Sequence, residues 1–329
     1  MSVNIIELKI IFGDIINGYS FIQNNDLSFY IKHLNTYETC NLDKKYKEYF
    51  NEALKSDLPL ENNKLKELYE EKSWTNNDNT EIKDSKNYLD GLNKTLTKLA
   101  LSEQIKEIKK QIQETELKIY NLNRKKEELL GLTAEKYANK RLNEYYIYSS
   151  LYKNTNFNDK VNLLYDWADF DDLEDIELLK ITNLYNKNSH NFNELNLKRI
   201  SLSPFFLNLF FLTDNNPVNF YNKSILELTD YQMLIFSYGI HNKNIIQENT
   251  HIDLMEYLEN PYELDEFVNR SKAAKDLMEK TKGKKGTKYV VGASSEDMEK
   301  FGLGGQNMPD FERLVGKDFS SAVQEGLIK

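Results

Sequence analysis

The clearest pattern of apolar and polar positions lies in the middle of the chain. Apolar residues recur there at alternating spacings of three and four. This is the a/d pattern of a heptad repeat, and it predicts a coiled-coil seam over about four repeats. Two positions of the pattern carry Thr115 and Lys126 instead. The apolar seam residues are Leu101, Ile105, Ile108, Ile112, Ile119, Leu122 and Leu129.

Segment 81–153 is predicted to form a coiled-coil hairpin around this seam. Between residues 85 and 130 the only glycine is Gly91 and there is no proline, so one long helix can run through the stretch. Gly131 is placed to end that helix, and Thr133 is placed to cap a returning helix over 134–153. An intermolecular coiled coil fits the same pattern.

The flanking segments also show helical spacing, so the predicted fold class is all-α. We expect a helical bundle with a long central coiled-coil hairpin and a glycine-rich C-terminal arm. Segment 1–80 is predicted to be an N-terminal helical region, although its isoleucine-rich start also suits a strand because isoleucine is β-branched. Segment 154–281 is predicted to be a helical globular domain.

Capping residues mark several helix boundaries in the predicted globular domain. Ser203 is expected to be an N-cap, with Pro204 as the first helical residue. Thr229 and Asp230 are expected to start a helix that ends before Gly239. The most apolar stretch of the chain, 202–212, is about half the ~20 residues that a membrane span requires, so we expect no membrane span.

Composition changes near residue 282. Eight of the 13 glycines lie in 283–329, and glycine raises the entropic cost of ordering a segment alone. Apolar residues at helical spacings remain in this stretch, and they could gain order by docking on a neighbour. We therefore expect 282–329 to be a flexible partner-binding arm. Its expected anchors are Phe301, Met308, Phe311, Leu314, Phe319 and Val323.

Charge and cysteine content narrow the function classes. The net charge of −9 makes nucleic acid an unexpected partner, because a duplex-binding protein needs a basic footprint. However, segment 85–150 carries 13 Lys and Arg against 9 Asp and Glu, so a nucleic-acid-associated regulatory or polymerase accessory protein remains the alternative. With Cys40 as the only cysteine, no internal disulfide can form, which favours a reducing compartment such as the cytoplasm.

No motif for catalysis, cofactor binding or metal binding is present. The acidic run 166–177 lacks the glycine that an EF-hand loop needs at its sixth position. None of the histidines has metal-ligand spacing, and we expect them to be ordinary surface or capping residues. They are His33, His190, His241 and His251. We therefore assign no catalytic residue, cofactor or metal and expect a non-enzymatic protein.

Three features together resemble tailed-bacteriophage virion or assembly proteins. They are the Asn-, Lys- and Ile-rich composition, the segment ILELTDYQMLIFSYGI (225–240), and a coiled coil that precedes a glycine-rich tail. The resemblance implies a structural or assembly protein of a large complex, in a tail, baseplate, neck or head, or an assembly chaperone. The implied partners are other protein subunits, with self-association open, and the implied location is the host cytoplasm or the virion. The resemblance transfers no functional residue.

Overall fold

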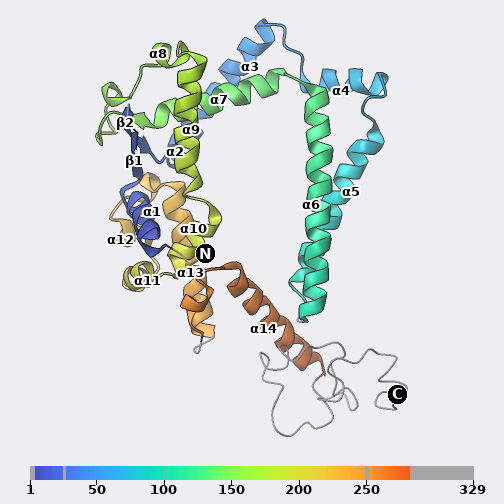
Figure 1. The fold of residues 1–329 in the computed structure, drawn as a ribbon, viewed down its shortest axis with the longest axis vertical. Helices are drawn as coiled ribbons and strands as arrows, with labels where there is room; N and C mark the ends of the chain where they lie inside the picture. The colour runs from blue at the N-terminus through green and yellow to red at the C-terminus, as the bar shows by residue number, and fades with distance from the viewer. Residues whose placement is uncertain (1–3, 25–26, 100, 249–251, 282–329) are drawn as a thin grey trace. The chain divides into compact units, whose positions relative to one another are not determined.

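The computed structural model describes residues 4–24, 27–99, 101–248 and 252–281 of the 329. Most of the described residues are helical (Figure 1), which confirms the predicted helical character. The chain divides into two compact units: unit 1 is Met1–Lys64 with Leu132–Tyr262, and unit 2 is Leu65–Gly131 with Glu263–Lys329. Each of the predicted segments 1–80 and 81–153 spans both units.

Unit 1 contains a small sheet, which departs from the all-α expectation. The helix α1 (Ile5–Asn17) leads into the strands β1 (Tyr19–Asn24) and β2 (Leu27–Lys32), and β2 also pairs with β3 (Leu151–Tyr152). All these pairs are antiparallel, in the order β1-β2-β3. Gly18 caps α1 with a φ of 79°, a conformation that favours glycine. The chain can therefore reverse where the sequence suggested a continued helical region.

The other elements of unit 1 are helices. Figure 1 labels most of them. The α-helices are α2 (Thr36–Leu42), α3 (Lys45–Lys55), α7 (Ala134–Ser150), α8 (Trp167–Asp171), α9 (Asp175–His190), α10 (Glu194–Leu202), α11 (Pro204–Phe210), α12 (Pro217–Tyr221) and α13 (Asp230–Glu248). Short 3₁₀ helices lie at Lys160–Asn162, Ile225–Glu227 and Leu254–Tyr257.

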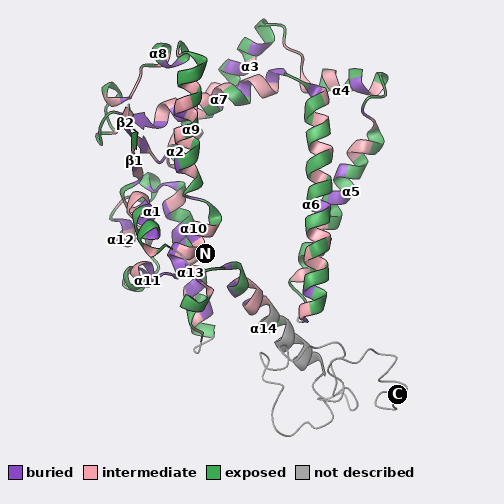
Figure 2. Ribbon diagram, viewed as in Figure 1, coloured by how far each residue is buried: buried purple, intermediate pink, exposed green. Residues whose placement is uncertain are grey.

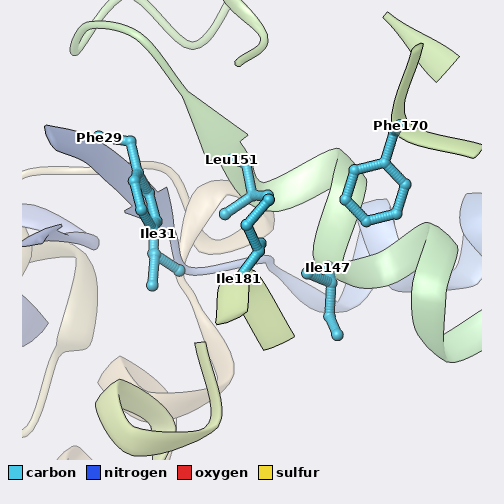
Figure 3. Packing of buried hydrophobic residues seen from close by; sticks show 6 residues of the cluster. All are labelled: Phe29, Ile31, Ile147, Leu151, Phe170 and Ile181. Atoms are coloured by element: carbon cyan, nitrogen blue, oxygen red, sulfur yellow. The ribbon is translucent and has the colours of Figure 1, made fainter. Parts of the chain in front are cut away.

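The sheet is held in unit 1 by a buried apolar cluster. Phe29 and Ile31 of β2 pack with residues of α7, β3, α8 and α9. In Figure 3 the side chains of Ile31, Leu151 and Ile181 lie close together. Phe29, Leu151 and Ile181 are each 1% exposed or less. Burying a side chain of this size contributes about 1.5–3 kcal/mol, so the cluster fixes the short sheet against the helices.

Two predicted helix starts in unit 1 are confirmed, but one predicted end is wrong. Ser203 is the N-cap of α11 with Pro204 in its first turn, and α13 begins at Asp230. The helix α13 does not end before Gly239 but continues to Glu248. A Cβ at position 239 would lie 2.8–2.9 Å from phenylalanine rings of α11. Gly239 therefore permits close helix packing and does not end the helix.

Unit 2 is built on an antiparallel pair of helices, α5 (Asn76–Leu96) and α6 (Ser102–Leu130). Lys118 pairs with Glu81 at 2.7 Å, and the Tyr88 hydroxyl donates to Gln111 Oε1 at 3.2 Å. The later residue of α5, Tyr88, thus faces the earlier residue of α6, Gln111, which is the order that antiparallel packing requires. Figure 2 shows that both helices are exposed over much of their surfaces, with buried residues at intervals.

The end of this helix pair where α5 begins and α6 ends has its own apolar core. Its buried residues are Leu68, Trp74, Ile82 and Leu130. The helix α4 (Glu61–Glu70) begins in unit 1 and ends in unit 2, and α14 (Tyr262–Thr281) crosses the boundary between Tyr262 and Glu263. Within unit 2, α14 is linked to α6 by an ion pair between Glu266 and Lys109.

The long helix predicted over residues 85–130 is interrupted. The segment 97–101 separates α5 from α6. The Thr95 hydroxyl donates to the Gly91 carbonyl and the Thr97 hydroxyl to the Lys94 carbonyl. Such local bonds weaken the helical backbone pattern only slightly, and α5 ends here without a proline or glycine.

The returning helix is also paired differently from the prediction. Thr133 caps α7 through the Lys136 N–H, as expected, but the main helical partner of α7 is α3 in unit 1. Tyr49 of α3 packs there with Ala138 and Leu142 of α7. The partner of α6 is α5. That the seam of α6 packs as a coiled coil stays a prediction.

Candidate functional site

A pocket of about 230 Å³ lies inside unit 1. We call it the His33 pocket. The residues that line it come from the end of β2, from α2, α7 and α9, from the turn after α9, and from the start of α13. The side chains that shape it are mainly aromatic or polar. Those used below are Lys32, His33, Tyr146, Tyr185, Phe192, Asp230 and Tyr231.

The mouth of the pocket is framed by two capped helix starts. Asn35 caps α2 in a reciprocal arrangement with Glu38. Thr229 lies before α13 and forms an antiparallel bridge with Asn35. The Thr36 hydroxyl then donates to Asp230 Oδ1 at 2.7 Å. Asn35 and Thr229 each accept from a backbone N–H that the first turn of their helix leaves unpaired. The bridge between these same two residues joins the two helix starts.

The start of α13 is also tied to the end of α1. Gln232 is fully buried, and its Nε2 donates to the Ile15 carbonyl at 2.8 Å and to the Ile16 carbonyl at 3.1 Å. Its Oε1 accepts the Thr229 N–H at 3.0 Å. One amide therefore satisfies carbonyls at the C-terminus of α1 and a donor at the N-terminus of α13. The position of Asp230 and Tyr231 is fixed by this contact.

His33 is buried at the inner side of the pocket, with 5% of its surface exposed. Its ring packs edge-on against Phe192 and Tyr231, with centroid distances of 4.7 and 5.3 Å. Burial lowers the pKa of His33 to about 3, and the positive charge of Lys223 contributes in the same direction. His33 is therefore a neutral imidazole at neutral pH.

The hydrogen bonds around His33 assign its tautomer. His33 Nε2 lies 3.0 Å from the Ser20 hydroxyl, and Ser20 also hydrogen-bonds to Asp14. An ionised carboxylate only accepts, so Ser20 donates to Asp14 and accepts from Nε2–H. Nδ1 then carries the lone pair. In the described part of the chain this buried atom has no hydrogen-bond partner.

Neutral phenols form much of the pocket wall. Burial raises the pKa of both Tyr185 and Tyr231. Tyr231 stacks on Phe192 with a centroid distance of 4.7 Å and an interplanar angle of 22°. The Tyr146 hydroxyl donates to Asp43, which does not line the pocket. Aromatic rings from α7, α9, α13 and the turn after α9 are thus brought to one place.

The two charged side chains in the pocket wall, Lys32 and Asp230, differ in their partners. Lys32 is ion-paired with Glu38. Asp230 lies in the first turn of α13, where the helix dipole favours a negative charge. It accepts a hydrogen bond from neutral Thr36, and no ion pair to it exists among the described residues. Asp230 is thus the exposed carboxylate of the pocket wall that has no cationic partner among the described residues.

This arrangement suits binding better than proton transfer. An effective general base has a pKa near the working pH, whereas the pKa of His33 is about 3 and its Nε2–H is committed to Ser20. The pocket is lined instead by aromatic rings, hydroxyl groups and a carboxylate, which contribute to recognition.

The structure places the predicted seam residues on the protected side of α6. Leu101 and Ile105 are 9% and 7% exposed. The remaining seam positions are half-buried, and Thr115, which interrupts the pattern, is buried. They belong to unit 2, whereas the His33 pocket belongs to unit 1. The anchors predicted in 282–329 lie outside the described residues.

His33 is the main site residue that sequence reasoning missed. The expectation that the histidines are surface or capping residues is wrong for His33, although His190 and His241 are exposed. A local signal for His33 exists. Phe29, Ile31 and His33 stand at every second position and are all buried, as side chains on one face of a strand are. Reading 27–33 as a strand would have placed His33 in the core.

No group of three or more His, Cys, Asp or Glu side chains is arranged to hold a metal ion in the ranges that the structure describes. Nor does any described helix combine the length and apolar character needed to cross a membrane. The chain matches no protein-family model, no curated protein and no solved structure.

Proposed function

We propose that the chain is a non-enzymatic structural or assembly protein of a large complex, in a phage tail, baseplate, neck or head, or an assembly chaperone for one. It would act in the host cytoplasm or in the virion. The observation that carries the proposal is a set of exposed apolar side chains on two contacting helices of unit 1, which we call the apolar surface. Its members are Ile6 and Ile10 of α1, Leu209 of α11, and Phe211 and Leu212 at the end of α11.

The two helices that carry this surface are in direct contact. The ring of Phe12 in α1 lies 5.5 Å from that of Phe205 and 5.8 Å from that of Phe206, both in α11. Ile10 nevertheless remains 62% exposed and Leu212 80% exposed. Single exposed apolar residues are normal, but several on adjoining elements mark a protein-interaction surface. Contact with another subunit would remove them from water.

The ion pairs of basic residues in α6 argue against the alternative of nucleic-acid binding. Lys106 pairs with Glu103 at 3.3 Å, Lys118 with Glu81 at 2.7 Å, and Arg124 with Glu128 at 3.2 Å. A phosphate backbone would have to compete with these carboxylates. These pairs place carboxylates beside three of the basic residues, so the basic side chains of α6 do not form a continuous basic face such as the alternative requires.

The predicted arm adds a second contact region to the proposal. Its anchors, Phe301, Met308, Phe311, Leu314, Phe319 and Val323, follow α14 in the sequence. Short apolar segments in a glycine-rich stretch gain little from folding alone and need a surface to pack on. We propose that they bind a neighbouring subunit.

Density-gradient fractionation tests the assembly role. A tagged full-length chain is expressed in the cells that naturally produce it, and the lysate is fractionated before and after a high-salt wash. The proposal expects the chain in a salt-resistant, fast-sedimenting complex, either mature particles or their precursors. A chain that sediments as a free monomer throughout production would refute the proposal.

Surface variants then ask whether the apolar surface is responsible. The double variant Ile10→Glu with Leu212→Glu should leave the complex and keep its helical circular dichroism. The control is Val161→Glu, because Val161 is also 80% exposed in unit 1 but belongs to a different segment. If the double variant sediments with the complex as the control does, the apolar surface is not the contact.

A further inference from the structure

We propose that the His33 pocket binds a small organic ammonium ion, with the charged nitrogen held against aromatic rings and beside Asp230. The proposal concerns a ligand of unit 1 and does not rest on the assembly role. Four features of the pocket support it: the aromatic wall, the Asp230 carboxylate without an ion-pair partner, the pairing of Lys32 with Glu38, and the volume.

The aromatic wall supplies the first requirement for an organic cation. Tyr146, Tyr185, Phe192 and Tyr231 come from separate segments and all line the same pocket. An aromatic ring presents a negative face, and a cation within about 6 Å of its centre is attracted to it. Groups of such rings are a common way to recognise alkylated ammonium ions. The rings also contact the alkyl carbons that surround the nitrogen.

The charges of the pocket favour a cation over an anion. Asp230 is the carboxylate in the wall, and the one cationic side chain in the wall, Lys32, is already paired with Glu38. His33 contributes no positive charge, because its imidazole is neutral, and its ring edge contacts both Phe192 and Tyr231. Lys223, whose positive charge acts on His33, lies outside the pocket wall and donates to the Ile16 and Asn17 carbonyls. An entering anion would therefore meet Asp230 without an unpaired cation in the wall.

The volume limits the size of the ligand. The pocket offers about 230 Å³ and is partly open to solvent, and a closed cavity of about 150 Å³ is known to hold benzene. A molecule with fewer than roughly a dozen heavy atoms therefore fits. Choline and methylammonium lie within this size and are suitable probes.

Calorimetric titration of the full-length protein with choline tests the proposal. The matched comparison is the neutral carbon isostere of choline, in which a tert-butyl group replaces the trimethylammonium group. We expect choline to bind at least about tenfold more tightly, because the isostere keeps the shape and loses the charge. Methylammonium serves as a smaller probe. If neither cation binds, or if choline and its isostere bind equally, the proposal fails.

Variants locate the binding. Asp230→Asn keeps an oxygen that can accept from Thr36 and removes the charge, and it should weaken choline binding about tenfold. Asp175→Asn is its control, since Asp175 is exposed in the first turn of α9. Binding that is unchanged in Asp230→Asn places the cation elsewhere.

A ring variant separates aromatic contact from hydroxyl contact. Tyr231→Phe should bind choline almost as the natural protein does, whereas Tyr231→Leu should lose most of the affinity. Tyr37→Leu is the control, because Tyr37 is 65% exposed and outside the pocket. Circular dichroism checks that Tyr231→Leu is folded, and Asp230→Asn carries the test if it is not. Equal affinity in Tyr231→Leu and the natural chain overturns the aromatic contact.

Discussion

Replacing His33 should remove a specific part of the pH dependence of stability in unit 1. A histidine in an unfolded chain has a pKa of about 6.5, whereas burial lowers the pKa of His33 to about 3. As the pH falls, the unfolded chain therefore binds the proton first. The stability contributed by neutral His33 is fully present above about pH 6.5 and is lost as the pH falls toward 3.

The magnitude follows from this difference in pKa. At pH 5 the free energy of unfolding should be about 2 kcal/mol lower than at pH 8 on account of His33 alone. Any folded pKa below about 4 gives nearly the same figure, because the folded state then binds almost no proton at pH 5. Burial raises the pKa of Asp14, which acts in the opposite direction. A comparison of variants is therefore needed.

His33→Gln is the informative change. The Gln amide can donate to Ser20 as Nε2–H does, but it does not titrate. The variant can lose stability at every pH, so the readout is the difference between the two pH values and not stability itself. That difference should be about 2 kcal/mol smaller in His33→Gln than in the natural chain. His190→Gln is the control, since His190 is exposed at the end of α9.

Urea unfolding followed by tryptophan fluorescence can report on unit 1 alone. The chain has 2 tryptophans, Trp167 in unit 1 and Trp74 in unit 2. In a Trp74→Phe background the signal comes from Trp167, which packs against the rings of Tyr145 and Phe170. If His33→Gln shows the same pH dependence as its parent, burial of a neutral His33 does not control the acid sensitivity of this unit.

Two further pairs of substitutions test the packing. Gly239→Ala should destabilise unit 1 by about 1–2 kcal/mol in urea unfolding, because overpacking against two phenylalanine rings outweighs the gain in helix propensity. Gly13→Ala should instead stabilise unit 1 by about 0.5–1 kcal/mol, because a Cβ there meets nothing within 4 Å. The reverse order would show that Gly239 is not a close-packing position. Ile105→Asp should lower the free energy of unfolding of unit 2 by several kcal/mol, measured through Trp74 fluorescence, because it buries a carboxylate. Leu117→Asp, at a 60% exposed position, should change that free energy by less than about 0.5 kcal/mol. Equal effects would place the contact face of α6 elsewhere.

Local signals explain the parts of the fold that the sequence predicted well. The starts at Thr133, Pro204 and Asp230 depend on residues within one turn of the helix. A cap works through bonds to N–H groups two or three positions away, so its evidence lies in a short stretch of sequence. The heptad spacing likewise indicates the face of α6 that is protected from solvent.

The partner of each helix could not be predicted in the same way. A seam pattern indicates which face of a helix is buried but not what covers it, and both α5 and α7 are plausible neighbours of α6 along the chain. The break at 97–101 decides the outcome, because it allows α5 to fold back on α6. That break involves threonine hydroxyls and no glycine or proline, so the usual helix-ending signals were absent.

The His33 pocket was still harder to predict, because its walls come from residues nearly 200 positions apart. The local sequence could have predicted one part of the pocket, because the alternation of Phe29, Ile31 and His33 places His33 on the buried face of a strand. The contacts of His33 with Phe192 and Tyr231 depend on how α9 and α13 pack, which no short spacing encodes.

Gly239 shows why a local rule can fail even where its residue is read correctly. Glycine near the end of an apolar helical stretch is a sound signal for a helix end, since it tolerates the left-handed conformation. Glycine also allows two helices to approach closely. The choice between these roles is made by Phe206 and Phe210, about thirty residues earlier in the chain, which occupy the space a Cβ would need. The sequence around position 239 is compatible with both roles, and only packing against α11 selects one.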